Sequence, residues 1–139
     1  MIRRLLLTLF FPLFLFAGES GFLHDYQKAL QEAQLQHKAV YMLITSQTCR
    51  WCKKFEEQTL SDKDTIDALK KEFVLLHLDR DNDTFPKTYD TKRIPRHYFI
   101  TSKGEVIYTF LGYWNVENFN AFLYDIQTNY LQKFKGKNK

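Results

Sequence analysis

Two cysteines separated by two residues are the feature that most constrains how this chain can fold. They follow closely on a short apolar segment, residues 40–45, whose composition favours a buried strand. After Cys49, the residues Cys52, Phe55 and Thr59 recur at helical spacing. The sequence therefore predicts a buried strand, a polar turn and then a helix that opens at the cysteine pair.

The composition is that of a globular protein with one domain. The chain has 139 residues, of which 45% are apolar and 26% charged, and its formal net charge is +4. These values exclude a disordered, collagen-like or coiled-coil protein. The chain has only two cysteines, and they are too close in sequence to close a useful loop, which excludes a disulfide-stapled scaffold. We therefore expect these cysteines to have a chemical role in the first place, and a structural role only second.

The first eighteen residues have the layout of a secretory signal peptide. Two arginines precede a thirteen-residue, mostly apolar run at 5–17, and the small residue Gly18 follows. Such a run is shorter than the roughly 20 residues of a membrane-spanning helix. We expect residues 1–18 to be a signal peptide and 19–139 to be the folded domain, with an uncleaved N-terminal membrane anchor as the alternative. Loss of the two arginines lowers the net charge to +2, which is too small to indicate a nucleic-acid partner.

Hydrophobic periodicity predicts the order α-β-α-α-β-loop-β-β-α along the folded domain. Helices are expected at 22–37, from 49 to a break at 61–62, from there to 72, and at 116–134; strands are expected at 40–45, 73–78, 97–101 and 106–111, and a polar loop at 79–92. Strand–helix–strand crossovers imply parallel pairing, and the turn at 102–105 adds an antiparallel hairpin. The prediction is an α/β fold with a mixed central sheet and helices on both faces.

The position of the cysteines at a helix start predicts their chemistry. Unpaired backbone N–H groups and the positive end of the helix dipole favour a thiolate there, and Arg50 adds a fixed positive charge. Such surroundings can lower a thiol pKa from about 8.5 to roughly 3.5–7.5. Cys49 is therefore expected to attack a substrate disulfide, and Cys52, one turn further on, to release the mixed disulfide.

Metal binding is the other use of such a cysteine pair. A structural zinc site needs four ligands, and the chain has four histidines but no second cysteine pair. We therefore expect no metal and no other cofactor. Copper(I) can be held by two thiolates alone, so a non-enzymatic copper(I) carrier remains an alternative.

Over its whole mature length the chain resembles the thioredoxin superfamily. The segments VYMLIT, TCRWCKKFE, FVLLHLD and YDTKRIPRHYFI carry the likeness. It looks most similar to secreted thioredoxin-like proteins of the SoxW type and to the C-terminal domain of DsbD. Those proteins carry C-x-x-C-K, then acidic residues and a T-[LF]-S-D stretch, which here correspond to residues 49–53, Glu56, Glu57 and residues 59–62. The resemblance implies a thioredoxin fold.

The resemblance also implies a cis-proline at Ile94–Pro95, facing the cysteines. The main chain of Ile94 would then bind an extended substrate segment, and the ring of Pro95 would hinder metal capture. A trans proline at a strand start is the alternative. Trp51 is expected either to form an apolar rim for the substrate or to pack on its own helix.

Three departures from thioredoxin matter for the chemistry. Thr48 stands where thioredoxin has Trp, and Leu43 stands where thioredoxin buries an acid that helps to deprotonate the second cysteine. Cys52 must therefore lose its proton another way, through water or Glu56, although Glu56 can also be read as a solvated helix residue. His97 is either an imidazolium that raises the redox potential or an ordinary strand histidine.

These features predict a periplasmic thiol–disulfide oxidoreductase that acts as a monomer. We expect it to reduce disulfides of exported proteins, apocytochrome c among the candidates, with electrons from a membrane donor of the DsbD or CcdA type. A thiol oxidant or isomerase of the same fold is the alternative within the enzyme class.

Overall fold

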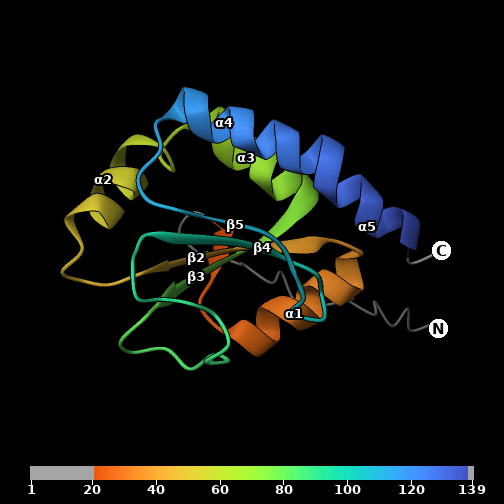
Figure 1. Cartoon of the computed structure of the whole chain (residues 1–139), viewed down its shortest axis with the longest axis horizontal. Coiled ribbons are helices and arrows are strands. Elements are labelled where there is room, and N and C mark those ends of the chain that lie inside the picture. The colour runs from red at the N-terminus through yellow and green to blue at the C-terminus, as the bar shows by residue number, and fades with distance from the viewer. Residues whose placement is uncertain (1–20, 138–139) are drawn as a thin grey trace, which may run out of the picture.

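A five-stranded sheet in the order β1-β3-β2-β4-β5 forms the centre of the molecule (Figure 1). The structure is a computed structural model that describes residues 21–137, so the predicted signal peptide lies outside the described residues. The elements are β1 (Phe22–Leu23), α1 (Tyr26–Gln36), β2 (Ala39–Thr45), α2 (Arg50–Gln58), α3 (Lys63–Glu72), β3 (Phe73–Asp79), β4 (Arg96–Ile100), β5 (Val106–Leu111), α4 (Val116–Asp125), the π-helix η2 (Ile126–Leu131) and α5 (Gln132–Lys137). Within residues 21–137 no helix has the length and apolar character needed to cross a bilayer.

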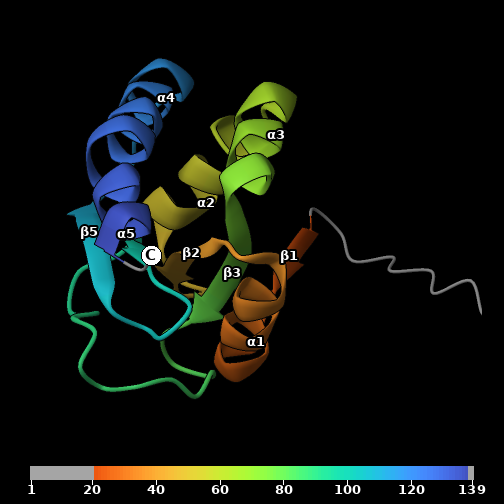
Figure 2. The same cartoon turned by 90° about the vertical axis from the view of Figure 1, so that its right-hand side faces the viewer.

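The sheet is mixed, as predicted. The central strand β2 runs parallel to β3 and antiparallel to β4, while β1 is parallel to β3 and β5 antiparallel to β4. Figure 2 shows α1 on one face and α2, α3 and α4 on the other. Every residue of β2 is buried, because helices cover both faces of this strand. The α/β thioredoxin fold expected from the sequence is confirmed.

Alternate residues of β2 enter two separate cores, as the period of a strand requires. Tyr41 and Leu43 pack with Phe55, Phe99 and Phe119 beneath α2, α3 and α4. The neighbouring residues of β2 face the other way, into a core that α1 shares with side chains of the loop between β3 and β4. This loop contains no helix, which agrees with the predicted polar loop at 79–92.

The predicted helix at 22–37 is too long at its start. Phe22 and Leu23 instead form the short strand β1, because they pair with Leu75 and Leu76 along the edge of β3. The helix begins after Asp25, whose carboxylate accepts a hydrogen bond from a main-chain N–H of the first turn.

The predicted helix at 116–134 is interrupted by a π-helical segment, η2. Ile126 and Leu131, five residues apart, both enter the core beneath the helices. A π-helix has i→i+5 hydrogen bonds and can place residues with this spacing on one face, which a regular α-helix does less well.

Candidate redox site

The two cysteines lie where the central strand passes through a short turn into α2. Cys49 is the N-cap of this helix, and its Sγ accepts a hydrogen bond from the main-chain N–H of Cys52 at 3.2 Å. The two residues form a disulfide with a Cα–Cα distance of 5.2 Å. Cys49 is partly exposed, whereas Cys52 is fully buried. An incoming thiol or disulfide can therefore reach Cys49 more readily than Cys52.

A shallow groove of about 690 Å³ lies beside the disulfide and brings together the predicted binding residues. Trp51, Ile94 and Pro95 line it, together with Leu111, Gly112, Tyr113 and two cations of the preceding loop, Lys92 and Arg93. The Ile94–Pro95 peptide bond is cis. Trp51 is 46% exposed, and its ring centroid lies 6.1 Å from that of Tyr113. The ring of Trp51 thus lines the groove next to Tyr113.

Positive charge surrounds the ring of Trp51. The guanidinium of Arg50 lies 5.3 Å from the centroid of the Trp51 ring, and the ammonium of Lys54 lies 5.1 Å from it. Lys54 also lies 4.7 Å from the ring centroid of Tyr113. Arg50 occupies the first turn of α2, directly after Cys49. Its charge is therefore close in sequence to the sulfur of Cys49.

A row of three residues crosses the sheet on the face that α2 covers. Leu43 on β2 is in register with His77 on β3 and with His97 on β4. Side chains in register point to the same face of a sheet. Leu43, which stands where thioredoxin has a buried acid, therefore has a histidine on each side. Sequence reasoning did not single out His77, because strand register cannot be read from the sequence.

His97 is a neutral residue of the core. Its Nε2 lies 2.8 Å from the Gly112 carbonyl oxygen and its Nδ1 lies 2.8 Å from the Tyr41 hydroxyl. A carbonyl can only accept, so Nε2 carries the proton and Nδ1 accepts from Tyr41. Burial lowers the pKa of His97 to about 3. The interpretation as a charged imidazolium is therefore wrong, and that as an ordinary strand histidine is confirmed.

Glu56 and His77 share a polar pocket of about 240 Å³ on the other side of Leu43. Glu56 follows Cys52 by four residues on α2, which places the two on one helix face. Burial, and to a lesser extent Glu57, raises the pKa of Glu56, while Lys53 acts in the opposite direction. Glu56 is therefore half-buried, unlike the solvated helix residue that one interpretation describes.

His77 is held at two points of this pocket. Its Nδ1 lies 3.6 Å from Glu56 Oε1, and its Nε2 lies 2.7 Å from the Thr45 hydroxyl. Burial, followed by the nearby His24, lowers the pKa of His77. Among residues 21–137, no group of three or more His, Cys, Asp or Glu side chains is arranged to hold a metal ion.

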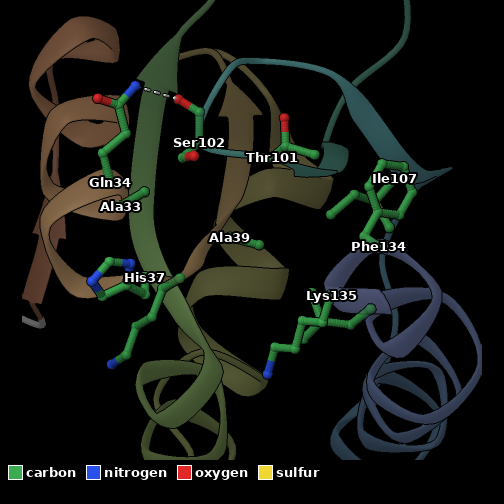
Figure 3. A pocket seen from close by; sticks show the side chains of 11 residues that line it. Ala33, Gln34, His37, Ala39, Thr101, Ser102, Ile107, Phe134 and Lys135 are labelled. Carbon is green, nitrogen blue, oxygen red and sulfur yellow. Dashed lines mark hydrogen bonds between the residues drawn. The ribbon is translucent and has the colours of Figure 1, made fainter. Parts of the chain in front are cut away.

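A second cavity, of about 350 Å³, lies near the start of β2 and the end of β4, far along both strands from the cysteines. Figure 3 shows Gln34 donating a hydrogen bond across it to the Ser102 carbonyl, with Phe134 and Lys135 of the C-terminal helix on another wall. None of its lining residues also lines the groove beside Trp51, and it lies at the other ends of β2 and β4, so it is separate from the redox site.

Comparison with known proteins identifies the family. Residues 26–127 match the family described as a thioredoxin-like domain. No curated protein sequence matches the chain. A thioredoxin from Thermus thermophilus is similar in structure, with 21% identity, a TM-score of 0.68, and 78% of this chain and 88% of the other covered.

Two further solved structures are similar in fold. The oxidised C-terminal domain of Neisseria meningitidis DsbD has 21% identity and a TM-score of 0.60, and 73% of this chain and 95% of that domain are covered. The periplasmic thioredoxin SoxS from Paracoccus pantotrophus has 12% identity and a TM-score of 0.52, with 64% and 95% covered. The chain belongs to the family of thioredoxin-like domains, and its Cys49–Cys52 disulfide supports the activity of a thiol–disulfide oxidoreductase.

Proposed function

We propose that this protein is exported to the periplasm and reduces the disulfides of other exported proteins. The observation that carries the proposal is the pairing of an accessible Cys49 at a helix start with a fully buried Cys52 one turn away. The first can meet a substrate, and the second is shielded from competing reagents until a mixed disulfide forms.

The reaction consists of two exchanges. The Cys49 thiolate attacks one sulfur of the substrate disulfide, which forms a mixed disulfide and releases the other substrate sulfur as a thiolate that takes up a proton. Cys52 then loses its proton and attacks Cys49 Sγ. This step re-forms the Cys49–Cys52 disulfide and releases the second substrate thiolate. The N-terminal end of α2 and the charge of Arg50 favour the Cys49 thiolate in the first exchange.

Glu56 is the residue best placed to accept the proton of Cys52. It lies one turn further along the same helix, is half-buried, and has a raised pKa. A carboxylate whose pKa is raised toward neutrality is a better base than an exposed one. Leu43 leaves no acid at the corresponding position of β2. In this proposal the base is on α2 instead of the central strand.

The groove beside the disulfide would bind the substrate chain. The main chain of Ile94 offers hydrogen-bonding groups to an extended segment, as in strand addition, while Trp51 and Pro95 provide apolar contact. These roles place the substrate sulfur close to Cys49.

Export and direction rest on the sequence and on the relatives. The leader-like residues 1–18 would direct the domain, residues 19–139, across the inner membrane. The exported domain would act as a monomer. A dithiol protein of the membrane, of the DsbD or CcdA type, would return the reactive pair to the reduced state by supplying two electrons and two protons. The similarity to a DsbD domain and to a periplasmic thioredoxin supports this placement.

The test is the reduction of insulin and of a model mixed disulfide, combined with the reduction potential of the pair. We expect activity from the wild type, none from Cys49→Ser, and a trapped mixed disulfide from Cys52→Ser. A potential near −270 mV would support a reductase, and one near −120 mV would support the oxidant. Equal activity of the wild type and Cys49→Ser would disprove the proposal, and copper(I) binding without reductase activity would favour the carrier.

A further inference from the structure

The groove beside the disulfide has a strong and one-sided charge. Lys92 and Arg93 line it directly, and no acidic residue does. Arg50 and Lys54 lie over the exposed ring of Trp51, which forms part of the same groove. Four cations therefore surround one apolar surface, and they come from two segments that lie far apart in the sequence.

These four cations have no acidic partner within the described part of the chain. Among residues 21–137, salt bridges involve other residues, and none includes Arg50, Lys54, Lys92 or Arg93. Asp90 is the acid nearest to Lys92 in sequence, but its carboxylate accepts the main-chain N–H of Lys92. Glu57 lines a neighbouring pocket together with Arg50 and Lys54 but forms no salt bridge with either, so the four cations remain available to a ligand.

The loop that carries Lys92 and Arg93 is held in place by hydrogen bonds to its main chain. The guanidinium of Arg80 donates hydrogen bonds to the carbonyl oxygens of Thr91 and Lys92, at 3.2 and 3.5 Å. The hydroxyl of Tyr98 donates to the Asp90 carbonyl at 3.0 Å. Lys92 and Arg93 are thus attached to a main chain that is fixed at several points. Binding a ligand there therefore costs less conformational entropy.

We propose that this groove selects disulfides whose cysteine is flanked by acidic residues in an extended protein segment. The inference rests on the proposed function and names the substrate class of that site. The apolar residues of the groove, Trp51, Ile94 and Pro95, contact the cysteine-bearing segment. The cations on both sides attract carboxylates one or two residues away from its sulfur. Complementary charges of this kind raise the association rate and exclude segments of the wrong sign.

The chemistry of the exchange by itself disfavours acidic substrates, and the groove compensates for this. Carboxylates beside a substrate sulfur disfavour the thiolate that must leave in each exchange, because like charges repel. Cations of the groove offset this repulsion when the segment is bound. A basic segment gains nothing from the groove and is repelled by it.

The experiment uses three peptides that differ only at the residues flanking one cysteine, which are Glu, Gln or Lys. The cysteine is held in a mixed disulfide with the neutral thiol 2-mercaptoethanol. At low ionic strength we expect kcat/KM for the Glu peptide to exceed that for the Gln peptide by about five- to tenfold, the size of two exposed ion pairs. The Lys peptide should be the slowest. In 0.5 M salt the three values should converge, because surface charges are screened.

Variants then locate the effect. Replacing both loop cations, Lys92→Glu with Arg93→Glu, should reverse the order so that the Lys peptide is preferred. The control reverses two exposed cations at the opposite end of the sheet, Lys71→Glu with Lys103→Glu, which changes the net charge by the same amount and should leave the order of the three rates unchanged.

The outcomes separate this inference from the proposed function. If no peptide is reduced, the proposed reductase fails. If all three are reduced at equal rates in low salt, the reductase stands and the charge selection is wrong. If the control pair changes the preference as much as the loop pair does, net charge decides the effect and the groove does not, which also overturns the inference.

Discussion

Two histidines on either side of Leu43 share one row of the sheet but have different surroundings. His97 on β4 is fully buried, makes a hydrogen bond with each ring nitrogen, and stacks on Phe110 at a centroid distance of 4.3 Å. His77 on β3 is partly exposed and lies in a polar pocket with Glu56. The first has its protonation state set by the core, and the second lies where protons can be exchanged.

The difference follows from what covers each strand. The row is hidden on the β4 side by Phe55, Phe110 and Phe119, whose rings surround the His97 imidazole. On the β3 side the Phe22 ring lies against His77 in a T-shaped contact, but the pocket that His77 lines is otherwise polar and opens to solvent between α2 and the loop after β3. The same residue type can therefore be a structural element or a titrating group within one row. The burial and the neighbours decide which.

The largest effect should come from truncating the buried histidine. His97→Ala should lower the free energy of unfolding by about 3–5 kcal/mol, because it removes ring packing and leaves the buried Tyr41 hydroxyl without its partner. The matched variant His77→Ala should cost about 1 kcal/mol. Urea unfolding of the oxidised proteins measures both. Equal losses would mean that the two sites do not differ in the way described.

Acid should destabilise the protein through His97. Its folded pKa of about 3 lies below its ordinary value of 6.5, so between these values the unfolded chain binds a proton that the folded protein does not. Stability should therefore fall as the pH is lowered from about 6.5 toward 3. Between pH 6 and 4 the loss should be about 2–3 kcal/mol, at about 1.4 kcal/mol per pH unit.

His97→Phe is the control for this pH dependence. The variant keeps an aromatic ring in the core and has no proton to take up, while the other titrating groups, Glu56 and His77 among them, remain. Urea unfolding at several pH values gives the slope for both proteins. If the variant keeps the slope of the wild type, the acid sensitivity comes from elsewhere.

Much of the fold could be predicted because its signals are local. The helix that opens at Cys49 and the helix capped by Asp62 follow from residue spacing and capping, and both are present. The hairpin turn and the loop before Pro95 could be recognised from their own residues in the same way. These features depend on neighbours in the sequence.

The remaining features depend on register and on long-range packing. The strand at Phe22 forms because an edge of β3 is open to it, and the row containing His77 exists only once β3 is in register with β2. The charge of the groove likewise arises where α2 meets the loop before Pro95. Periodicity along the chain contains none of this information.

A smaller effect is expected at the polar end of the row. Glu56→Gln should slow the attack of Cys52 on the mixed disulfide by about tenfold or more, because the amide cannot accept the thiol proton. The rate of the wild type should rise with pH as Glu56 ionises, and the variant should lack this rise. Single-turnover release of a labelled substrate thiol measures the step.

Glu57→Gln is the matched control, because it removes an exposed acid of the same helix. Because Glu57 contributes to the raised pKa of Glu56, its removal should move the rise in rate to lower pH and leave the rate above this rise close to that of the wild type. Equal slowing in both variants would assign the effect to the loss of negative charge on α2, and Glu56 would then not be the proton acceptor.

The smallest effect should come from His77→Gln. The amide can still bond to the Thr45 hydroxyl, and His77 is partly exposed, so stability should change by less than about 1 kcal/mol. Protonated His77, 3.6 Å from Glu56 Oε1, favours the carboxylate of Glu56. Its removal should therefore move the Glu56-dependent rise in rate to higher pH, by less than about one unit. The pH profile of the same single-turnover step measures this shift. A profile that does not move would mean that the two groups titrate independently, and the contrast between the two histidines would then be one of burial alone.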